Sequence, residues 1–446
     1  MTNIDTECDT KTTVIDSVCG SGKTSYAIQL MNDSYQSGTD VFIENEDGGY
    51  IDKRDKFIYV TPFLNEAERV KREAIIDIIT PMNRPTKYHD VKRLVSYGES
   101  IVMTHELFAR LTIDILSEIE MQGYTLIMDE VANVLQQVDI SKREIEMLVD
   151  AKSIEIDEES GQVEWIDEDY DTKDSKRFKD IKTLAEKHNL YIERNTAMFW
   201  TMDVESFSCF DKVYILTYLF DGQIQKYYYD INDLEYEKKA VIKQGDKYIL
   251  KEYNVSEEPR DEVGELLSIY EDYESKTGRK SKLNSNYANE VSKWTLSSGW
   301  FEKASNEQIN QLNKNLYSFF KNRCSTPNKQ LFWTAKKSIA PKLVNGKTKI
   351  NKNDDRTKDN FLPLNARATN EYRDRTAMAY VYNRFMNPME KSFFHSRGVS
   401  VNEDMLAQSD LIQFLFRGCI RNNEVMNCYI PSKRMRELLY DWLEYK

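Results

Sequence analysis

The fold is decided by the stretch TTVIDSVCGSGKTSYAIQLMN, which spans Thr12–Asn32. Its β-branched run, Thr13–Ile15, predicts a buried strand, and the apolar residues within 27–31 have the spacing of a helix. The glycine-containing segment Ser17–Thr24 lies between the two. A strand, a glycine-rich loop and a helix in this order are the context of a phosphate-binding P-loop.

The residue types of this loop suit a nucleoside triphosphate. Gly20 and Gly22 allow backbone N–H groups to curl around phosphate oxygens without interference from a Cβ. Lys23 would bring positive charge to the β- and γ-phosphates, and the Thr24 hydroxyl would bind Mg²⁺. We therefore predict ATP and Mg²⁺ as cofactors, with the nucleotide held by Gly20, Ser21, Gly22, Lys23, Thr24 and Ser25.

A second apolar run, Thr125–Met128, ends in two carboxylates. A P-loop needs an acidic partner at the end of a neighbouring buried strand. Asp129 would support Mg²⁺, and Glu130 would polarise the attacking water as a general base.

Two further strands are predicted between these motifs. Phe57–Val60 leads to Thr61, and Ile101–Met103 leads to Thr104 and then to a helix expected over Glu106–Leu116. Strands that alternate with helices indicate a parallel sheet covered on both faces, whose ligands gather at the carboxyl ends of the strands. The predicted fold class is α/β.

The order GSGKT, VTP, MTH and MDEVA resembles motifs I, Ia, Ib and II of superfamily 2 helicases of the DEAD/DEAH-box-like type. The tetrad here, Asp129–Ala132, is neither DEAD nor DEAH. Thr217, at the end of the apolar run Val213–Thr217, resembles motif III. The resemblance implies two RecA-like lobes with ATP bound between them, and an ATP-driven helicase or translocase of a phage or prophage type.

The C-terminal half carries segments similar to the later motifs of this family. Leu331–Lys336 resembles motif IV and Phe361–Asn370 resembles motif V, each as a strand followed by polar residues. Asp410–Arg421 resembles motif VI. The family likeness implies that Gln413, Arg417 and Arg421 act on the γ-phosphate across the cleft, and their spacing predicts one helical face. By the same likeness, nucleic acid would contact Thr61, Thr104, Thr334, Arg367 and Thr369.

The distribution of charge bears on the partner. The chain has 61 Lys and Arg against 74 Asp and Glu, a net charge of −13, which by itself disfavours a polyanion. Residues 301–400, however, contain 19 basic and 8 acidic residues, a net charge of +11, which leaves −24 for the rest. We expect side chains of this basic stretch, Arg373 and Arg375 among them, to follow a nucleic-acid backbone, DNA more than RNA.

Negative charge is concentrated in an apparent insertion at about 141–195. Its segment SIEIDEESGQVEWID alternates apolar and acidic residues around Ser-Gly, which predicts a β-hairpin. We interpret this insertion as a solvated element or as a site for a protein partner.

A length of 446 residues predicts two domains. We place an ATPase lobe at 1–235, a connecting or accessory segment at 236–309 and a second lobe at 310–446. The tyrosine-rich residues of 221–305 are expected to pack in cores rather than to stack on bases. The polar N-terminus and the lack of a long apolar run predict no membrane association and a cytoplasmic location, in the bacterial host if the gene belongs to a phage.

Two other classes of function are compatible with the same P-loop. A phage DNA-packaging motor ATPase would add a C-terminal nuclease, which needs a cluster of acidic metal ligands in that half. A non-motor P-loop NTPase would act as a switch, and its hydrolysis would not respond to nucleic acid. The oligomeric state cannot be inferred from the sequence.

Overall fold

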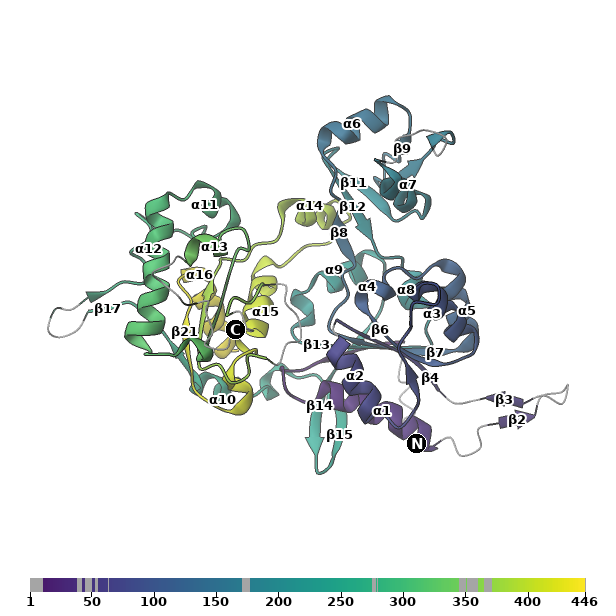
Figure 1. Cartoon of the computed structure of the whole chain (residues 1–446), viewed down its shortest axis with the longest axis horizontal. Coiled ribbons are helices and arrows are strands. Elements are labelled where there is room, and N and C mark those ends of the chain that lie inside the picture. Colours follow the sequence, from purple (N-terminus) through teal and green to yellow (C-terminus); the bar gives the residue numbers. More distant parts are fainter. Residues whose placement is uncertain are drawn as a thin grey trace, which may run out of the picture. The chain divides into compact units, whose positions relative to one another are not determined.

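The computed structural model describes residues 11–37, 42–44, 50–52, 55–62, 64–170, 177–274, 278, 280–344, 350, 360–364 and 371–445 (Figure 1). The chain divides into two compact units. The first unit comprises 1–16, 22–251 and 386–401, and the second unit comprises 17–21, 252–385 and 402–446.

The first unit is built on one large sheet. Among the described residues it has eight strands, in the order β15 (Lys247–Glu252), β14 (Glu237–Gln244), β1 (Thr12–Asp16), β13 (Lys212–Thr217), β7 (Tyr124–Asp129), β4 (Lys56–Thr61), β6 (Ser100–Thr104) and β5 (Ile78–Ile79). Every neighbouring pair from β14 to β5 is parallel. The predicted α/β class with parallel strands is therefore confirmed.

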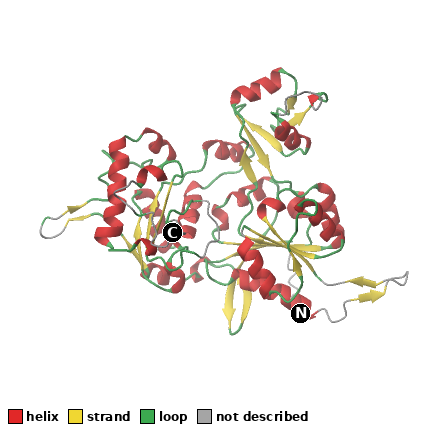
Figure 2. Ribbon diagram, viewed as in Figure 1, coloured by secondary structure: helices red, strands yellow, loops and turns green. Residues whose placement is uncertain are grey.

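The central strands of this sheet are buried on both faces, and their successive side chains enter the two cores alternately. Val14 and Ile58 belong to a core with helices α3 (Lys87–Ser96) and α5 (Ile113–Gln122). Ile15 and Tyr59 belong to the opposite core, with α1 (Lys23–Ser37) and α2 (Leu64–Glu73). Figure 2 shows these helices around the strands. In these central strands, Asp16, Thr61, Thr104 and Asp129 place polar groups at the carboxyl ends.

One predicted helix is wrong. In place of a single helix over Glu106–Leu116, the chain forms α4 (His105–Phe108) and α5, and each is preceded by a threonine in extended conformation, Thr104 and Thr112. Thr104 accepts a hydrogen bond from the N–H of Leu107 at 3.3 Å and so caps α4. The extended backbone at Thr112 divides the predicted helix into two.

The remaining described elements of the first unit outside the insertion are short. They are β2 (Phe42–Glu44), β3 (Tyr50–Asp52), α8 (Glu205–Ser208), the 3-10 helix η2 (Phe220–Gly222) and α9 (Ile224–Ile231). Tyr227, Tyr228 and Tyr229 of α9 are almost fully buried, so the prediction of core packing is confirmed for these three tyrosines.

The insertion forms a middle domain with its own core. Its elements are β8 (Leu135–Gln137), α6 (Lys142–Asp150), β9 (Ile154–Ile156), β10 (Val163–Trp165), α7 (Lys179–Glu186), β11 (Leu190–Glu193) and β12 (Ala197–Thr201). β9 and β10 pair antiparallel, with Ile154 opposite Trp165, so the predicted hairpin is confirmed. Ile145, Leu148, Ile181 and Met198 are among the core residues.

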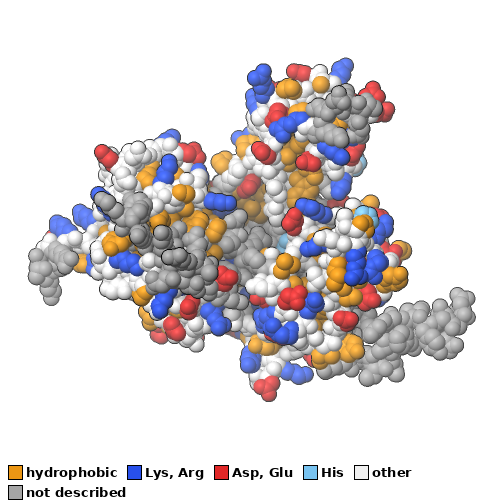
Figure 3. All heavy atoms as spheres, viewed as in Figure 1, with side chains coloured by type: hydrophobic (Ala, Val, Ile, Leu, Met, Phe, Trp, Pro, Cys, Tyr) orange, Lys and Arg blue, Asp and Glu red, His pale blue; other side chains and the backbone are white. Residues whose placement is uncertain are grey.

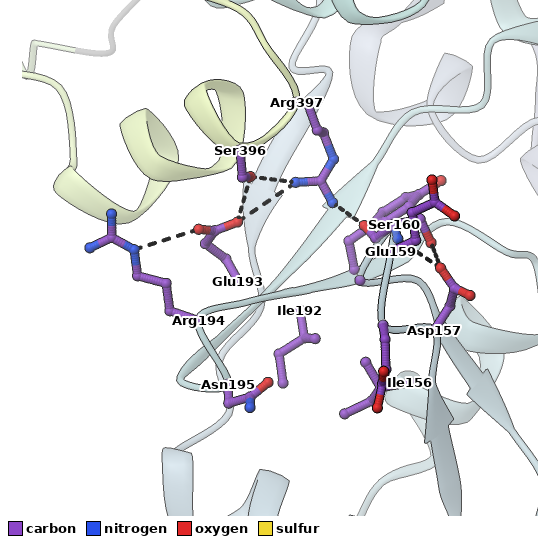
Figure 4. A pocket seen from close by; sticks show the side chains of 13 residues that line it. Ile156, Asp157, Glu159, Ser160, Ile192, Glu193, Arg194, Asn195, Ser396 and Arg397 are labelled. Atoms are coloured by element: carbon purple, nitrogen blue, oxygen red, sulfur yellow. Dashed lines mark hydrogen bonds and ion pairs between the residues drawn. The ribbon is translucent and has the colours of Figure 1, made fainter.

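Helix α14 (Pro388–Ser396), from far along the sequence, packs on the middle domain. Phe393 lies against Phe199, with ring centroids 5.4 Å apart. The hydroxyl of Ser392 donates to one carboxylate oxygen of the buried Glu193 at 2.5 Å. The hydroxyl of Ser396 donates to the other at 2.9 Å (Figure 4).

Arg397 completes this contact. Its guanidinium lies 3.7 Å from an oxygen of Glu193 and donates at 2.7 Å to the carbonyl of Ser160, in the β9–β10 turn. A cavity of about 770 Å³ is lined here by 156–161, 191–195, Ser396 and Arg397. None of the predicted site residues lines it.

The second unit contains a smaller parallel sheet. Its described strands follow the order β16 (Leu267–Ile269), β21 (Met426–Tyr429), β20 (Ala377–Val381) and β19 (Leu331–Ala335). The helices of five or more residues are α10 (Arg260–Glu265), α11 (Ser298–Lys303), α12 (Asn306–Tyr317), the π-helix η4 (Ser318–Arg323), α15 (Glu403–Leu415) and α16 (Lys433–Leu443).

Shorter elements complete this unit. They are η3 (Val255–Glu257), β17 (Tyr273–Glu274), β18 (Lys280–Ser281), η5 (Asn328–Gln330), α13 (Ala340–Leu343) and η6 (Cys419–Asn422). The segment 236–309 thus supplies β14 and β15 to the large sheet and β16 to the smaller one. Across the described part of the chain, no helix combines the length and the apolar character needed to cross a membrane.

The contact between α14 and the middle domain yields a prediction about stability. Glu193→Ala removes the acceptor of two serine hydroxyls and leaves the half-buried Arg397 without its carboxylate. We expect a loss of about 2 kcal/mol in the free energy of unfolding, measured as a lower melting temperature in calorimetry. Glu158→Ala, at an exposed residue of the same domain, is the control and should melt like the wild type. Equal melting of Glu193→Ala and wild type would contradict the assignment.

Candidate nucleotide site

The glycine-rich loop connects β1 to α1, as the sequence predicted. Gly20 and Gly22 have φ of 91° and 99°, a left-handed conformation that side chains with a Cβ rarely adopt. A Cβ on Gly22 would also lie 2.2 Å from Cε1 of Tyr248 on β15. Both glycines are therefore required by the backbone of the loop.

The start of α1 is suited to an anion. The helix begins at Lys23, is 15 residues long, and has no acidic residue in its first turn. The N–H groups and the partial positive charge of its first turn consequently meet no carboxylate from that turn. The buried hydroxyl of Ser21 has no hydrogen-bond partner in the described structure. These features fit the phosphates of a nucleotide.

Asp129 ends β7 and is almost completely buried. The Thr61 hydroxyl at the end of β4 lies 3.5 Å from its Oδ2, and Nε2 of His105 lies 2.8 Å from its backbone carbonyl. His105 thus holds the end of β7. The next residue, Glu130, has a left-handed φ of 67° and donates its N–H to the carbonyl of Leu216 at 3.0 Å.

The carboxylates at this edge of the sheet repel one another. Burial, together with the nearby charges of Glu130 and Glu66, raises the pKa of Asp129 from 3.8 to about 7, whereas the charge of Lys23 lowers it. A site with this excess of acid suits a divalent cation held by oxygen ligands. Thr24 and Asp129 are the residues that would hold Mg²⁺.

Glu66 and Arg69 of α2 are site residues that the sequence analysis missed. Glu66 is buried, its Oε2 lies 3.6 Å from Nη1 of Arg69, and Nη2 of Arg69 lies 3.5 Å from the hydroxyl of Ser25. In the sequence, the only indication of this pair was that Glu66 and Arg69 lie three residues apart in a helix that follows Thr61-Pro62. The same spacing is common on exposed helices, so it did not single them out.

Asp16, at the end of β1, is a second residue that was missed. Its two carboxylate oxygens accept hydrogen bonds from the backbone N–H groups of Leu219 at 2.8 Å and Phe220 at 3.0 Å. Leu219 has a left-handed φ of 55°. Asp16 therefore ties the start of the P-loop to the segment that follows β13, which is 203 residues away in sequence.

The ends of β7 and β13 are held by two glutamines. Gln223 donates to the hydroxyl of Thr217 at 3.0 Å, so the residue that resembles motif III is anchored from its own loop. Gln225 of α9 accepts the N–H of Ala132 at 2.7 Å. The turn that carries Glu130 is thereby connected to the segment bound by Asp16.

The residues expected to contact nucleic acid occupy different environments. Thr61 is fully buried and faces Asp129, Thr104 caps α4, and Thr334 is buried in β19. Arg367 and Thr369, in the segment similar to motif V, lie outside the described residues. The strand predicted in that segment is represented, among the described residues, by one isolated β-bridge between Phe361 and Trp333.

The prediction that Gln413, Arg417 and Arg421 share a helical face is wrong. Helix α15 ends at Leu415, and Arg421 lies in the 3-10 helix η6. At Gly418 the chain passes close to β21 and β19, because a Cβ there would lie 2.4 Å from Sδ of Met426 and 3.0 Å from Cε1 of Phe332. Gln413 donates to Ser409 within α15, and Arg417 is buried.

The basic stretch 301–400 is also only partly available to a polyanion. Arg375 is buried, and its guanidinium donates to the backbone carbonyls of Asn328 and Lys329, so the expectation that it follows a phosphate backbone is wrong. Arg373 is exposed. On the face shown in Figure 3, described Lys and Arg side chains are mixed with Asp and Glu and form no single stripe.

Comparison with known proteins places this architecture in a family. The family model described as the YonV C-terminal Rossmann-like domain matches residues 261–443, and that of the YonV middle domain matches residues 135–200. The SPbeta prophage-derived protein YonV of Bacillus subtilis (strain 168) is 35% identical over 453 residues, which cover 97% of this chain and 98% of the relative. The chain belongs to the YonV family.

Solved structures of low sequence identity were also found. Xpd4 of S. tokodaii aligns with a TM-score of 0.47 at 12% identity, and a protein described as an XPD helicase aligns with a TM-score of 0.43 at 10% identity. Each alignment covers 97% of this chain and 94% of the other.

Asp16 generates a prediction about pH. Burial raises the pKa of its carboxyl from 3.8 to about 6, which outweighs the two backbone hydrogen bonds and the attraction of Lys238, whereas Asp221 raises it slightly. Between pH 4 and 6 the folded protein therefore keeps a proton on Asp16 that the unfolded chain has released. As the pH rises through this range, the free energy of unfolding falls, because the folded state then has to bury the charged carboxylate. A shift of two pKa units lowers the free energy of unfolding by at most about 3 kcal/mol.

Asp16→Asn, which stays neutral, should consequently unfold at a higher temperature than the wild type at pH 8 and at nearly the same temperature at pH 4. Calorimetric melting at both pH values checks this. Asp33→Asn, at an exposed residue of α1, should show no such pH-dependent gain. An Asp16→Asn variant that is less stable at pH 8 would show that the hydrogen bonds outweigh the burial of charge.

Proposed function

We propose that this YonV-family chain hydrolyses ATP with Mg²⁺ and couples the reaction to movement along nucleic acid, DNA in preference to RNA, as a helicase or translocase. The observation that carries the proposal is the pairing of a P-loop after β1 with Asp129 and Glu130 after β7, at the same edge of one parallel sheet. Parallel α/β sheets bind ligands at this edge.

The roles of the residues follow from their chemistry. Lys23 and the N–H groups of the loop would bind the phosphates, and Thr24 and Asp129 would hold Mg²⁺. When bound, the cation would neutralise charge on the phosphate oxygens. Glu130 would accept a proton from the attacking water. Its left-handed backbone follows directly on the end of β7, and strained backbone of this kind is found at functional sites.

The coupling to nucleic acid is supported by the order of the sequence motifs and by the basic stretch 301–400. A prophage-derived relative supports a role in phage or prophage DNA metabolism in the cytoplasm of a bacterial host. In this proposal Arg417 and Arg421 sense the γ-phosphate from the second lobe, and Arg367 and Thr369 contact the strand, whereas the buried Thr334 does not reach it. In the same proposal the insertion at about 141–195, which is rich in acidic residues, binds a protein partner.

The test is the rate of ATP hydrolysis without polymer and with single-stranded DNA, double-stranded DNA or RNA. We expect stimulation by DNA. Hydrolysis that no polymer changes would reject the motor and favour a switch. Stimulation by double-stranded DNA together with cleavage of that DNA would favour a packaging motor with a nuclease.

Glu130→Gln should separate binding from chemistry. The amide cannot accept the proton, so we expect kcat to fall by roughly 10²- to 10⁴-fold while ATP binding persists. Lys23→Ala should weaken ATP binding itself. The measurements are steady-state hydrolysis and calorimetric titration with ATP. Normal turnover by Glu130→Gln would remove its assignment as the base.

Arg417→Ala tests the proposed contact with the γ-phosphate. Removal of an arginine that stabilises the transferring phosphoryl group lowers turnover by roughly 10³-fold or more. Because Arg417 is buried, the melting temperature of the variant must be measured in parallel, to show that it is folded. A folded Arg417→Ala variant with wild-type turnover would show that the residue acts only in packing.

A further inference from the structure

The hairpin β14–β15 forms one edge of the large sheet and lies next to β1, the strand that leads into the P-loop (Figure 1). β14 runs parallel to β1, with Thr13 opposite Glu237 and Ile15 opposite Lys239. β1 ends one residue later at Asp16, whereas β14 continues to Gln244. The hairpin therefore extends beyond the carboxyl end of β1, where the glycine-rich loop begins.

Tyr248 of this hairpin is held in place by α1. The Gln29 side chain donates to the backbone carbonyl of Tyr248 at 2.8 Å and accepts its N–H at 2.8 Å. Both polar atoms of the Gln29 amide are thus used on one residue. The tyrosine backbone is fixed against the helix that follows the P-loop.

The ring of Tyr248 lies against the loop itself. A Cβ on Gly22 would be 2.2 Å from Cε1 and 2.8 Å from Cδ1, so the ring is in van der Waals contact with the glycine. The residue is only partly buried. The ammonium of the exposed Lys243 lies 5.9 Å from the ring centroid, where its charge would favour an anionic nucleotide. An aromatic surface is therefore available next to the predicted phosphate site.

The order of strands indicates which end of a nucleotide would meet this ring. β13 and β7 lie on one side of β1, and β14 lies on the other. The terminal phosphate has to reach Glu130, which follows β7. The nucleoside end then points toward the hairpin. Aromatic side chains bind bases by stacking, which contributes about 1–3 kcal/mol per base.

We propose that the β14–β15 hairpin forms the nucleoside side of the nucleotide site, with the Tyr248 ring stacked on the base. This proposal rests on the proposed function, because it requires a nucleotide at the P-loop. It adds a contact that is separate from phosphate binding and from hydrolysis.

The experiment compares nucleotides with inorganic tripolyphosphate, which has the phosphates and no base. Affinities of ATP, ADP and tripolyphosphate are measured with Mg²⁺ by calorimetric titration for the wild type, Tyr248→Phe and Tyr248→Leu. Leucine keeps apolar contact with Gly22 and removes the aromatic face, so the variant is expected to fold. Tyr35→Ala, at an exposed tyrosine of α1, is the matched control.

We expect Tyr248→Leu to weaken ATP and ADP about tenfold and to leave tripolyphosphate unchanged, with Tyr248→Phe and Tyr35→Ala like the wild type. An equal loss for tripolyphosphate would show that Tyr248 merely shapes the loop, and unchanged ATP affinity would also overturn the proposal. A wild type that binds tripolyphosphate as tightly as ATP would overturn the base contact alone. A wild type that binds neither would reject the proposed function as well.

Discussion

Burial of the large sheet on both faces is the constraint on which the rest of the first unit depends. Val14 and Ile15 of β1 point into opposite cores, so neither face of this strand has room for a polar ligand. Chemistry is confined to the edge where parallel strands end. Asp16, Thr61, Thr104 and Asp129 are the last residues of their strands, and the P-loop begins at the same edge.

The carboxyl ends of these strands carry buried carboxyl groups, whose charged form is unfavourable in an apolar environment. Asp16 and Asp129 are both buried, and the pKa of each is raised. Natural proteins retain such costs chiefly at functional sites. The left-handed backbone of Glu130 and Leu219 at the same strand ends is consistent with that reading. A bound cation with phosphates would offset the repulsion around Asp129.

The fold of the first unit was predictable because its strands are short apolar runs that end in polar residues. Periodicity also identified the β9–β10 hairpin. Contacts between distant segments were not predictable: Asp16 meets Phe220 and Gln29 meets Tyr248 through side chains that have no pattern in sequence. The arginine arrangement after α15 was missed because the helix ends at Leu415 and the chain then passes close to Met426 at Gly418, a contact that depends on tertiary packing.

The chain leaves the second unit after β20, contributes α14 to the first unit, and returns to the second unit at α15. The first unit is therefore discontinuous in sequence. A fragment cut after residue 251 would expose Phe199, which Phe393 covers, and would leave Glu193 without its serine donors. Neither unit can be obtained as a simple truncation, and only a circularly permuted or grafted chain would supply the first unit with its missing helix.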